Sequence, residues 1–371
     1  MMKETTTKLV VVLGPTASGK SSLGIDLALH FHGEIVSADS RQVYRGLDIG
    51  TAKVTAEEQA LVPHHLLDVA SVEENYTVSQ FQRQAIAAIN DIAARGRQPF
   101  LVGGSPHYIQ AVVDNLDIPA IAPQPALRAE LEAQPLADLL ARLEELDPQS
   151  AAVIDRNNPR RVIRALEVCM TSGKPFSEQR RVAAPLYTSL LLGIQWPRAE
   201  LYRRIDQRVD ERMQQGMVQE VRSFLDRGVS HERLEALGLE YRFTSRWLRG
   251  EFPSEQVIVE RLKYAIHDFT RRQLTWFRKD TRIVWIEGND VERAGSCLCG
   301  RRRAGSATLP GGQGIEPWRG IRGWSRPWHG VRARSCCSVE AVTACCAGGM
   351  CRVGSACGCK KRIRGWCRRS R

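Results

Sequence analysis

The sequence predicts an α/β fold in which a parallel β-sheet is flanked by helices. Along the 371 residues, short apolar runs alternate with stretches of helical periodicity, the order typical of parallel strands joined by helices. A second indication is GPTASGKS at 14–21, which follows the apolar run LVVVL and precedes the helix-like SSLGIDLALHF. This complete G-x-x-x-x-G-K-[ST] pattern lies in the strand–loop–helix context of a phosphate-binding P-loop.

The strands and helices of the predicted core can be assigned in chain order. Apolar runs with the length and composition of strands lie at 8–14, 33–40, 64–69, 98–105, 189–196 and, as an expected last edge strand, 281–288. Between the third and fourth runs, SQFQRQAIAAINDIAARG predicts an amphipathic helix that stops at a glycine. Two longer amphipathic helices are expected around 201–225 and 254–279.

These patterns divide the chain into four predicted segments. Residues 1–118 form the first part of a P-loop-type α/β core, and residues 188–290 form its second, more helical part. Residues 119–187 contain several prolines and helical patterns without a strand pattern, so we expect a mainly helical insertion domain. Residues 291–371 are rich in Arg, Gly, Cys and Trp and lack apolar periodicity, so we expect a disordered C-terminal tail.

The basic charge of the chain is concentrated in this tail. The whole chain has a formal net charge of +12, and residues 291–371 alone hold 17 Lys and Arg against 3 Glu. The net charge is therefore uninformative about what the folded body binds. Ten of the 11 cysteines also lie in the tail, without a paired CxxC spacing. We interpret the tail as an abnormal C-terminus from a shifted reading frame, with a metal site and a basic RNA-binding arm as alternatives.

The rest of the chain indicates a cytoplasmic protein. Cys169 is the single cysteine before residue 291, as expected in a reducing compartment. The first apolar run is too short for a signal peptide, and no stretch approaches the ~18 to 20 apolar residues that cross a bilayer. We therefore expect a monomer in the cytoplasm with no membrane partner.

The P-loop sequence predicts a site for a di- or triphosphate. Its glycines allow backbone N–H groups to turn toward an anion, and the following helix adds the positive end of its dipole. Lys20 supplies a positive charge and Ser21 a hydroxyl for magnesium, the expected cofactor. The alternative is a glycine-rich turn that binds no ligand, but the full motif between a strand and a helix favours phosphate binding.

Asp39 lies at the carboxyl end of the second predicted strand, at the same sheet edge as the P-loop. A carboxylate in this place can act as a general base beside a bound phosphate ester. The alternative, with about equal weight from this pattern alone, is that Asp39 or Ser40 caps a following helix.

Two basic segments suggest contact with nucleic acid. Arg160, Arg161 and Arg164, in NPRRVIRALEV, lie near one face of a helix start and suit phosphate contacts to RNA or a lid over a bound phosphate. FTRRQLTWFRK at 269–279 interleaves basic and aromatic residues. An ordinary exposed basic helix, or a helix with an apolar core stripe, would give the same patterns. His64, His65 and His107 lack metal-site spacing and are expected to be structural.

Taken together, the motifs resemble those of the bacterial tRNA dimethylallyltransferases. GPTASGKS, DSRQVYRGLDIGTAK, PHHLLD, VGGS with Tyr108, NPRRVIRALEV, RIDQRVDERM and RRQLTWFR occur in the family's order over about residues 8–290. The resemblance implies transfer of a dimethylallyl group from dimethylallyl pyrophosphate to the exocyclic amine of the adenosine 3′ of a tRNA anticodon. Its implied partners are tRNA and this pyrophosphate, and the insertion domain would face the tRNA.

The resemblance also implies roles for individual residues. Asp39 would deprotonate the amine, Ser105 would supply a hydroxyl, and Arg208 would clamp the pyrophosphate from the far side. Ser40, Arg41 and Gln42 would line the tRNA-facing lip together with Asp39, with Gln42 able to pair with a base edge. The pyrophosphate would be held by the loop residues Gly14, Pro15, Thr16, Ala17, Ser18, Gly19, Lys20 and Ser21.

One departure from the family pattern keeps other functions open. Where the family normally has Thr followed by GLY or a similar run, this chain has Ser105, Pro106, His107 and Tyr108. Proline removes a backbone donor and restrains the residue before it. The alternatives are a P-loop small-molecule kinase that uses ATP, and a catalytically impaired protein that only binds tRNA.

Overall fold

The parallel sheet predicted from the sequence is present. The computed structural model describes residues 7–119, 121, 124–179, 183–288 and 290–298. Its strands are β1 (Lys8–Leu13), β2 (Gly33–Ser37), β3 (His64–His65), β4 (Gln98–Gly103), β5 (Thr188–Gln195) and β6 (Val284–Glu287). They form one sheet in the order β3-β2-β4-β1-β5-β6, and every pairing is parallel. The predicted α/β class is confirmed.

The third strand is shorter than the run that predicted it. Only His64 and His65 pair with β2, because Leu66 and Asp68 have positive φ angles of 63° and 55°, which turn the chain out of the extended conformation. Both histidines make structural contacts: His64 Nδ1 lies 2.8 Å from the carbonyl oxygen of Val62, and His65 Nε2 lies 2.8 Å from a Glu34 carboxylate oxygen.

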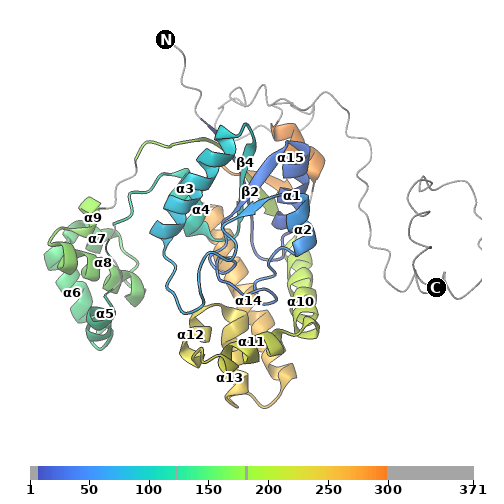
Figure 1. Ribbon diagram of the computed structural model, residues 1–371. Coiled ribbons are helices and arrows are strands. Elements are labelled where there is room, and N and C mark those ends of the chain that lie inside the picture. Colours follow the sequence, from blue (N-terminus) through green and yellow to red (C-terminus); the bar gives the residue numbers. More distant parts are fainter. Residues whose placement is uncertain (1–6, 120, 122–123, 180–182, 289, 299–371) are drawn as a thin grey trace, which may run out of the picture. The chain divides into compact units, whose positions relative to one another are not determined.

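Both faces of the sheet are covered by helices, as an all-parallel sheet requires. Alternate residues of β1 point to opposite sides, so that Val11 belongs to one buried cluster and Val12 to the other. Helices α3 (Val78–Ala94) and α4 (Pro106–Val113) bury apolar residues in the first cluster, and α1 (Lys20–His30) does so in the second (Figure 1). The first turn of α3 is stabilised by a capping box between Thr77 and Gln80.

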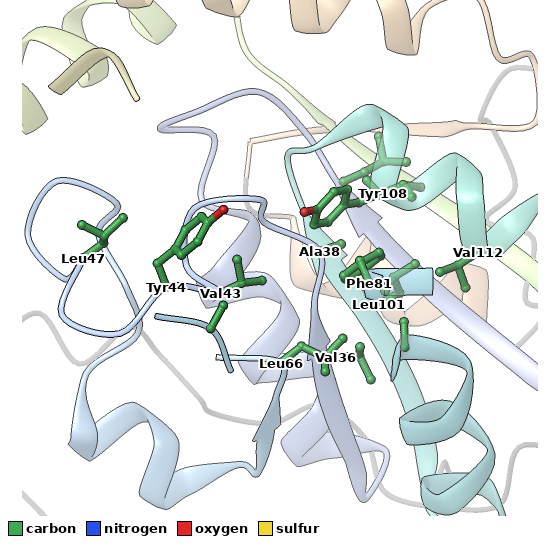
Figure 2. Close-up of a cluster of buried hydrophobic side chains, with 14 of the residues drawn as sticks. Val36, Ala38, Val43, Tyr44, Leu47, Leu66, Phe81, Leu101, Tyr108 and Val112 are labelled. Atoms are coloured by element: carbon green, nitrogen blue, oxygen red, sulfur yellow. The ribbon is translucent and has the colours of Figure 1, made fainter. Parts of the chain in front are cut away.

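Aromatic packing joins α4 to α3. Phe81 of α3 and Tyr108 of α4 stack with ring centroids 4.1 Å apart, beside Val36 and Leu101 of the central strands (Figure 2). Since Tyr108 lies three residues after Ser105, this contact holds the segment that links β4 to α4 in place.

The second half of the chain adds a helical layer next to the P-loop. Its helices, besides α15 (Val291–Leu298), are α10 (Arg198–Gln215), α11 (Met217–Asp226), α12 (His231–Ala236), α13 (Leu239–Leu248) and α14 (Glu255–Phe277); α2 (Ala56–Leu61) belongs to the first half. Helices α10 and α14 pack along each other (Figure 1) through a cluster that includes Ile205, Ile266 and, from the P-loop, Ala17. The P-loop therefore packs against a helical pair as well as against the sheet.

The predicted insertion is helical in its described residues. It contains α5 (Pro125–Glu132), α6 (Leu136–Leu146), α7 (Pro148–Val153), α8 (Pro159–Ser172) and α9 (Phe176–Gln179). These helices share a small core of their own, with Leu131, Leu143, Val162 and Leu166 fully buried. None of the described residues between 119 and 187 forms a strand. The domain limits themselves stay a prediction.

The prediction of a disordered tail from residue 291 onward is wrong for residues 291–298. Residues Val291–Leu298 form α15, which packs on α1, and Ala294 and Leu298 are fully buried in the second cluster (Figure 1). The segment is only eight residues long, shorter than the window that a periodicity argument needs, and it is buried through its contact with α1. Predictions for the remaining tail fall outside the described residues.

The packing of α15 predicts that Leu298→Ala destabilises the protein. Removing a fully buried leucine side chain leaves a cavity between α15 and α1, and the free energy of unfolding should fall by about 2–5 kcal/mol. Urea unfolding followed by tryptophan fluorescence measures this change. Arg293→Ala, at an exposed position of the same helix, should stay within about 0.5 kcal/mol of the parent. Equal stabilities of both variants would contradict the burial.

Candidate active site at the carboxyl ends of the strands

Loops after β1, β2 and β4 meet at one edge of the sheet. These strands are neighbours in the order β2-β4-β1, and ligands of open α/β sheets bind outside the carboxyl ends of such strands. Ala38, directly after β2, is bonded both to β4 and to the loop that follows it: its N–H donates to Val102 O at 2.8 Å, and its carbonyl oxygen accepts the Ser105 N–H at 3.3 Å. A Cβ at Gly103 would lie 2.1 Å from the Ala38 oxygen, so only glycine permits this approach.

The P-loop presents part of its backbone amides to an anion. Ala17 and Gly19 have left-handed φ angles of 59° and 90°, which turn successive peptide units around a common centre. Among the described residues, no backbone bond takes the amides of Ala17 and Gly19. Lys20 and Ser21 begin α1, where the first N–H groups of a helix have no intrahelical acceptor. Four amides are thus available for an anion.

Two of the amides expected to bind the anion are used inside the protein. Ser18 N–H donates to Pro15 O at 3.3 Å, and Thr16 N–H donates to Gln273 Oε1 at 3.1 Å. Among the predicted phosphate-binding residues 14–21, the backbone amides of Thr16 and Ser18 are therefore already occupied. Their role is to fix the shape of the loop.

The carbonyl groups of the P-loop are tied back from the outside. Trp196 Nε1 donates to Ser18 O at 2.9 Å, and Arg204 Nε donates to Ala17 O at 3.0 Å. The Arg204 guanidinium also lies over the Trp196 ring, 4.5 Å from its centroid. Because Trp196 holds the Ser18 carbonyl oxygen on one side, the Gly19 N–H of the same peptide faces the other side. The N–H that shares a peptide with Ala17 O is that of Ser18, which Pro15 O accepts.

Two cavities adjoin the P-loop and share three lining residues. The larger cavity has a volume of about 950 Å³ and the smaller one about 300 Å³. Lys20, Ser21 and Arg208 line both of them, whereas Asp39 and Ser105 line only the smaller one. The two cationic side chains therefore lie at the junction between a large and a small space.

Positive charge accumulates at this junction. Burial is the largest cause that lowers the pKa of Lys20 to about 8; Asp39 opposes the shift, and the neighbouring Arg208 and Arg212 contribute to it. Burial, with Arg212 as the next cause, lowers the pKa of Arg208 to about 10. Arg212 itself is buried and forms an ion pair with Glu240. An anion with two or more charges would relieve this repulsion.

Asp39 is held in a turn and does not cap a helix. Its Oδ1 accepts the Arg41 N–H at 2.9 Å, and the next helix along the chain is α2, which begins at Ala56. The capping alternative considered for Asp39 and Ser40 is therefore wrong. Ser105 Oγ accepts the Ser40 N–H at 3.0 Å and so connects the loop after β4 to the loop that carries Asp39.

The unusual Pro106 and His107 do not alter this arrangement. Pro106 is the first residue of α4, where its missing N–H would have had no helical acceptor. His107 is exposed, and neither residue lines either cavity. The serine in place of threonine keeps the hydroxyl that accepts the Ser40 N–H.

A model of the family described as IPP transferase matches residues 42–280. The chain belongs to this family. Among its relatives, the tRNA dimethylallyltransferase of Roseiflexus sp. is 49% identical over 296 residues, which cover 78% of this chain and 97% of the relative. The tRNA dimethylallyltransferase of Geobacillus thermodenitrificans is 45% identical, with 78% of this chain and 93% of the relative covered.

Solved structures of IPP transferases have the same fold. The full-length tRNA isopentenylpyrophosphate transferase of Bacillus halodurans matches with 36% identity and a TM-score of 0.60, over 79% of this chain and 96% of that one. A eukaryotic dimethylallyltransferase acting on tRNA matches with 26% identity and a TM-score of 0.67, over 80% of each chain. The resemblance found in the sequence motifs is confirmed.

Two residues expected to face tRNA in this transferase have internal partners. Gln42 is buried: its Nε2 donates to the carbonyls of Thr51 and Ala52 at 3.3 Å and 3.2 Å, and its Oε1 accepts from Ser37. Arg164 bonds the buried carboxylate of Glu167 at 2.5 Å. These side chains hold loops and helices together, so we do not extend a base-reading or phosphate-binding role to them.

The other residues expected to contact tRNA are accessible. Arg160 and Arg161 are exposed at the start of α8, and Ser40 and Arg41 line the smaller cavity. The sequence interpretation missed Trp196, Arg204 and Arg212, which support or extend the phosphate site. Arg212 lies one helical turn after Arg208, and this i, i+4 spacing in RIDQRVDER was the signal that could have found it.

The donor set is compatible with magnesium but does not form a cage. Ser21 offers a hydroxyl at the phosphate end of the site, and magnesium normally takes few protein ligands besides substrate phosphates and water. Within the described residues, no group of three or more His, Cys, Asp and Glu side chains could hold a metal ion.

A separate finding concerns membranes. No described helix has the length and apolar character needed to cross a membrane.

The lowered pKa of Lys20 predicts a pH-dependent affinity for inorganic pyrophosphate. Below a pH of about 8 the free protein carries the Lys20 charge; above it the charge is lost, so the affinity should fall by up to about tenfold per pH unit. Isothermal titration calorimetry between pH 7 and 9 would measure this fall. Lys20→Arg keeps its charge throughout and corrects for ionisation of the ligand. The same pH dependence in both proteins would rule out Lys20 as its source.

Proposed function

We propose that this chain transfers a dimethylallyl group from dimethylallyl pyrophosphate to the exocyclic amine of the adenosine 3′ of a tRNA anticodon. The observation that carries the proposal is the shared wall of Lys20 and Arg208 between a large cavity and a small one that contains Asp39. The pyrophosphate would lie at this wall, and the adenine, extruded from the anticodon loop, would enter the smaller cavity.

The cationic junction would stabilise the leaving group. As the allylic C–O bond breaks, negative charge grows on the departing pyrophosphate oxygen. The free amides of Ala17 and Gly19, the first N–H groups of α1, and the charges of Lys20 and Arg208 surround the place where it develops. Because these groups are fixed before the reaction, they favour the transition state over the ground state.

Asp39 would accept the proton of the acceptor amine. The lone pair of this nitrogen is delocalised into the purine ring, so the free amine is a poor nucleophile. The new N–C bond forms as the C–O bond breaks, the N–H proton passes to the Asp39 carboxylate, and pyrophosphate leaves. Magnesium, when bound by Ser21 and the pyrophosphate oxygens, would add positive charge at the leaving group.

The tRNA would contact two accessible groups of residues. Arg160 and Arg161 suit phosphate contacts because they are exposed at a helix start, and Ser40 and Arg41 lie where the adenosine would enter. A cytoplasmic monomer stays the expectation for the assembly. Neither the small-molecule kinase nor the inert tRNA-binding protein is favoured by any feature of the site.

The proposal predicts that Asp39→Asn binds both substrates but transfers the prenyl group slowly. Asparagine keeps an oxygen that can accept the Arg41 N–H, yet it cannot take a proton. The transfer rate should fall by about 10²- to 10⁴-fold. Mass analysis of nucleosides from unmodified tRNA, after timed reaction with dimethylallyl pyrophosphate, gives this rate.

Asp226→Asn provides the matched control, because Asp226 is exposed and lines neither cavity. It should transfer at the parental rate. Transfer at the parental rate by Asp39→Asn would show that another group takes the proton. If the parent protein formed ADP from ATP and produced no prenylated nucleoside, the proposed prenyl transfer would be refuted in favour of a small-molecule kinase.

A further inference from the structure

Gln273 connects the P-loop to the loop after β4. The residue lies near the end of α14 and is 5% exposed. Its Oε1 accepts the Thr16 N–H at 3.1 Å, and its Nε2 donates to Gly104 O at 2.7 Å. One side chain thus joins two loops that belong to adjacent parallel strands, β1 and β4.

The same connection continues to Asp39. Gly104 precedes Ser105, whose Oγ accepts the Ser40 N–H at 3.0 Å, and Ser40 directly follows Asp39. A continuous series of hydrogen bonds and short chain segments therefore runs from the P-loop through Gln273 to the carboxylate.

The space around this connection is fully used. A Cβ at Gly104 would lie 3.2 Å from each of three atoms: Gln273 Nε2, Gly14 O and Lys20 Cε. A side chain there would have to displace either the Gln273 amide or the lysine. The backbone of the β4 loop, the P-loop lysine and Gln273 are thus packed to contact.

Helix α14 gives the amide a rigid support. Ile266 and Phe277, on either side of Gln273 in the helix, are buried in two different clusters. The helix therefore cannot shift without disturbing packing next to the sheet and next to α10. Both polar atoms of the Gln273 amide have partners, so it has little left to offer a substrate even though it lines the smaller cavity.

We propose that Gln273 is a positioning residue that sets the distance between the pyrophosphate cradle and the base Asp39. This inference rests on the proposed prenyl transfer. The Thr16 bond fixes the cradle and the Gly104 bond fixes, through Ser105 and Ser40, the carboxylate. A transfer reaction between two bound substrates is sensitive to such a distance, because a misplacement of about 1 Å costs about 10²-fold in rate.

The test replaces Gln273 by methionine, which has a similar length but forms neither hydrogen bond. Two quantities are measured in the full chain: the single-turnover rate of transfer at saturating tRNA and dimethylallyl pyrophosphate, and the dissociation constant of inorganic pyrophosphate. We expect the rate to fall by about 10- to 100-fold. The dissociation constant should change by no more than about twofold, because the anion-binding amides and Lys20 stay in place.

A matched control and a second variant complete the test. Gln256→Met makes the same substitution at an exposed position of α14 and should leave both quantities at the parental values. Gln273→Asn keeps the amide but is one methylene shorter, so it cannot span both loops; it should also be slow. If the methionine variant does not fold, the asparagine variant decides the question with the same two measurements.

A double variant separates positioning from general loss of packing. If Gln273 acts through Ser105, the variant with both Gln273→Met and Ser105→Ala should lose less rate than the product of the two single losses. The inference would be overturned if the rate loss of the double variant equalled the product of the two single losses. It would also be overturned if Gln273→Met transferred at the parental rate, or if its pyrophosphate affinity fell by the same factor as its rate. Absence of transfer by the parent protein would instead refute the proposed function.

Discussion

The burial of neighbouring cations is the constraint around which this site is built. Arg208 and Arg212 add to the burial that lowers the pKa of Lys20, and Arg212 does the same for Arg208. Asp39 and Glu240 compensate only part of this charge. The folded chain holds the cations together because α10, which carries both arginines, packs against α14 and the P-loop through apolar contacts. A bound polyanion would offset this buried charge, and under the proposed function the same cations would act on the leaving group.

The site is positive although the body of the chain is nearly neutral. Many carboxylates are neutralised locally by cations that serve the fold: Glu167 pairs with Arg128 and Arg164, and Lys53 pairs with Asp48 and Asp68. The Glu167 and Lys53 side chains are almost completely buried in these pairs. The electrostatic field at the cavity is therefore determined by the nearby charged side chains that are not neutralised by a partner. The net charge of the sequence does not reveal which side chains these are.

The sequence predicted those features that depend on neighbours along the chain. The sheet, the P-loop and the helical insertion follow from periodicity and from motif context, and each was found. The side chains of Gln42 and Arg164 were placed at the RNA surface because their type suits it, but their partners are decided by tertiary packing. Gln273 and Thr16 are 257 positions apart, and no pattern in the sequence joins them. Helix α15 was missed because the apolar residues of this short segment become buried only through contact with α1.

The P-loop illustrates how one motif can serve different reactions. The sequence pattern fixes the left-handed turns and the lysine, which suffice to bind phosphates. Inside the motif, Pro15 O takes the Ser18 N–H. Groups outside the motif do the rest: Gln273 takes the Thr16 N–H, and Trp196 and Arg204 bond the carbonyls of Ser18 and Ala17. These three residues come from β5's end, α10 and α14, all in the second half of the core. We therefore expect the reaction specificity of the loop to depend on these surrounding residues, since the motif alone recognises only the charge and shape of a diphosphate.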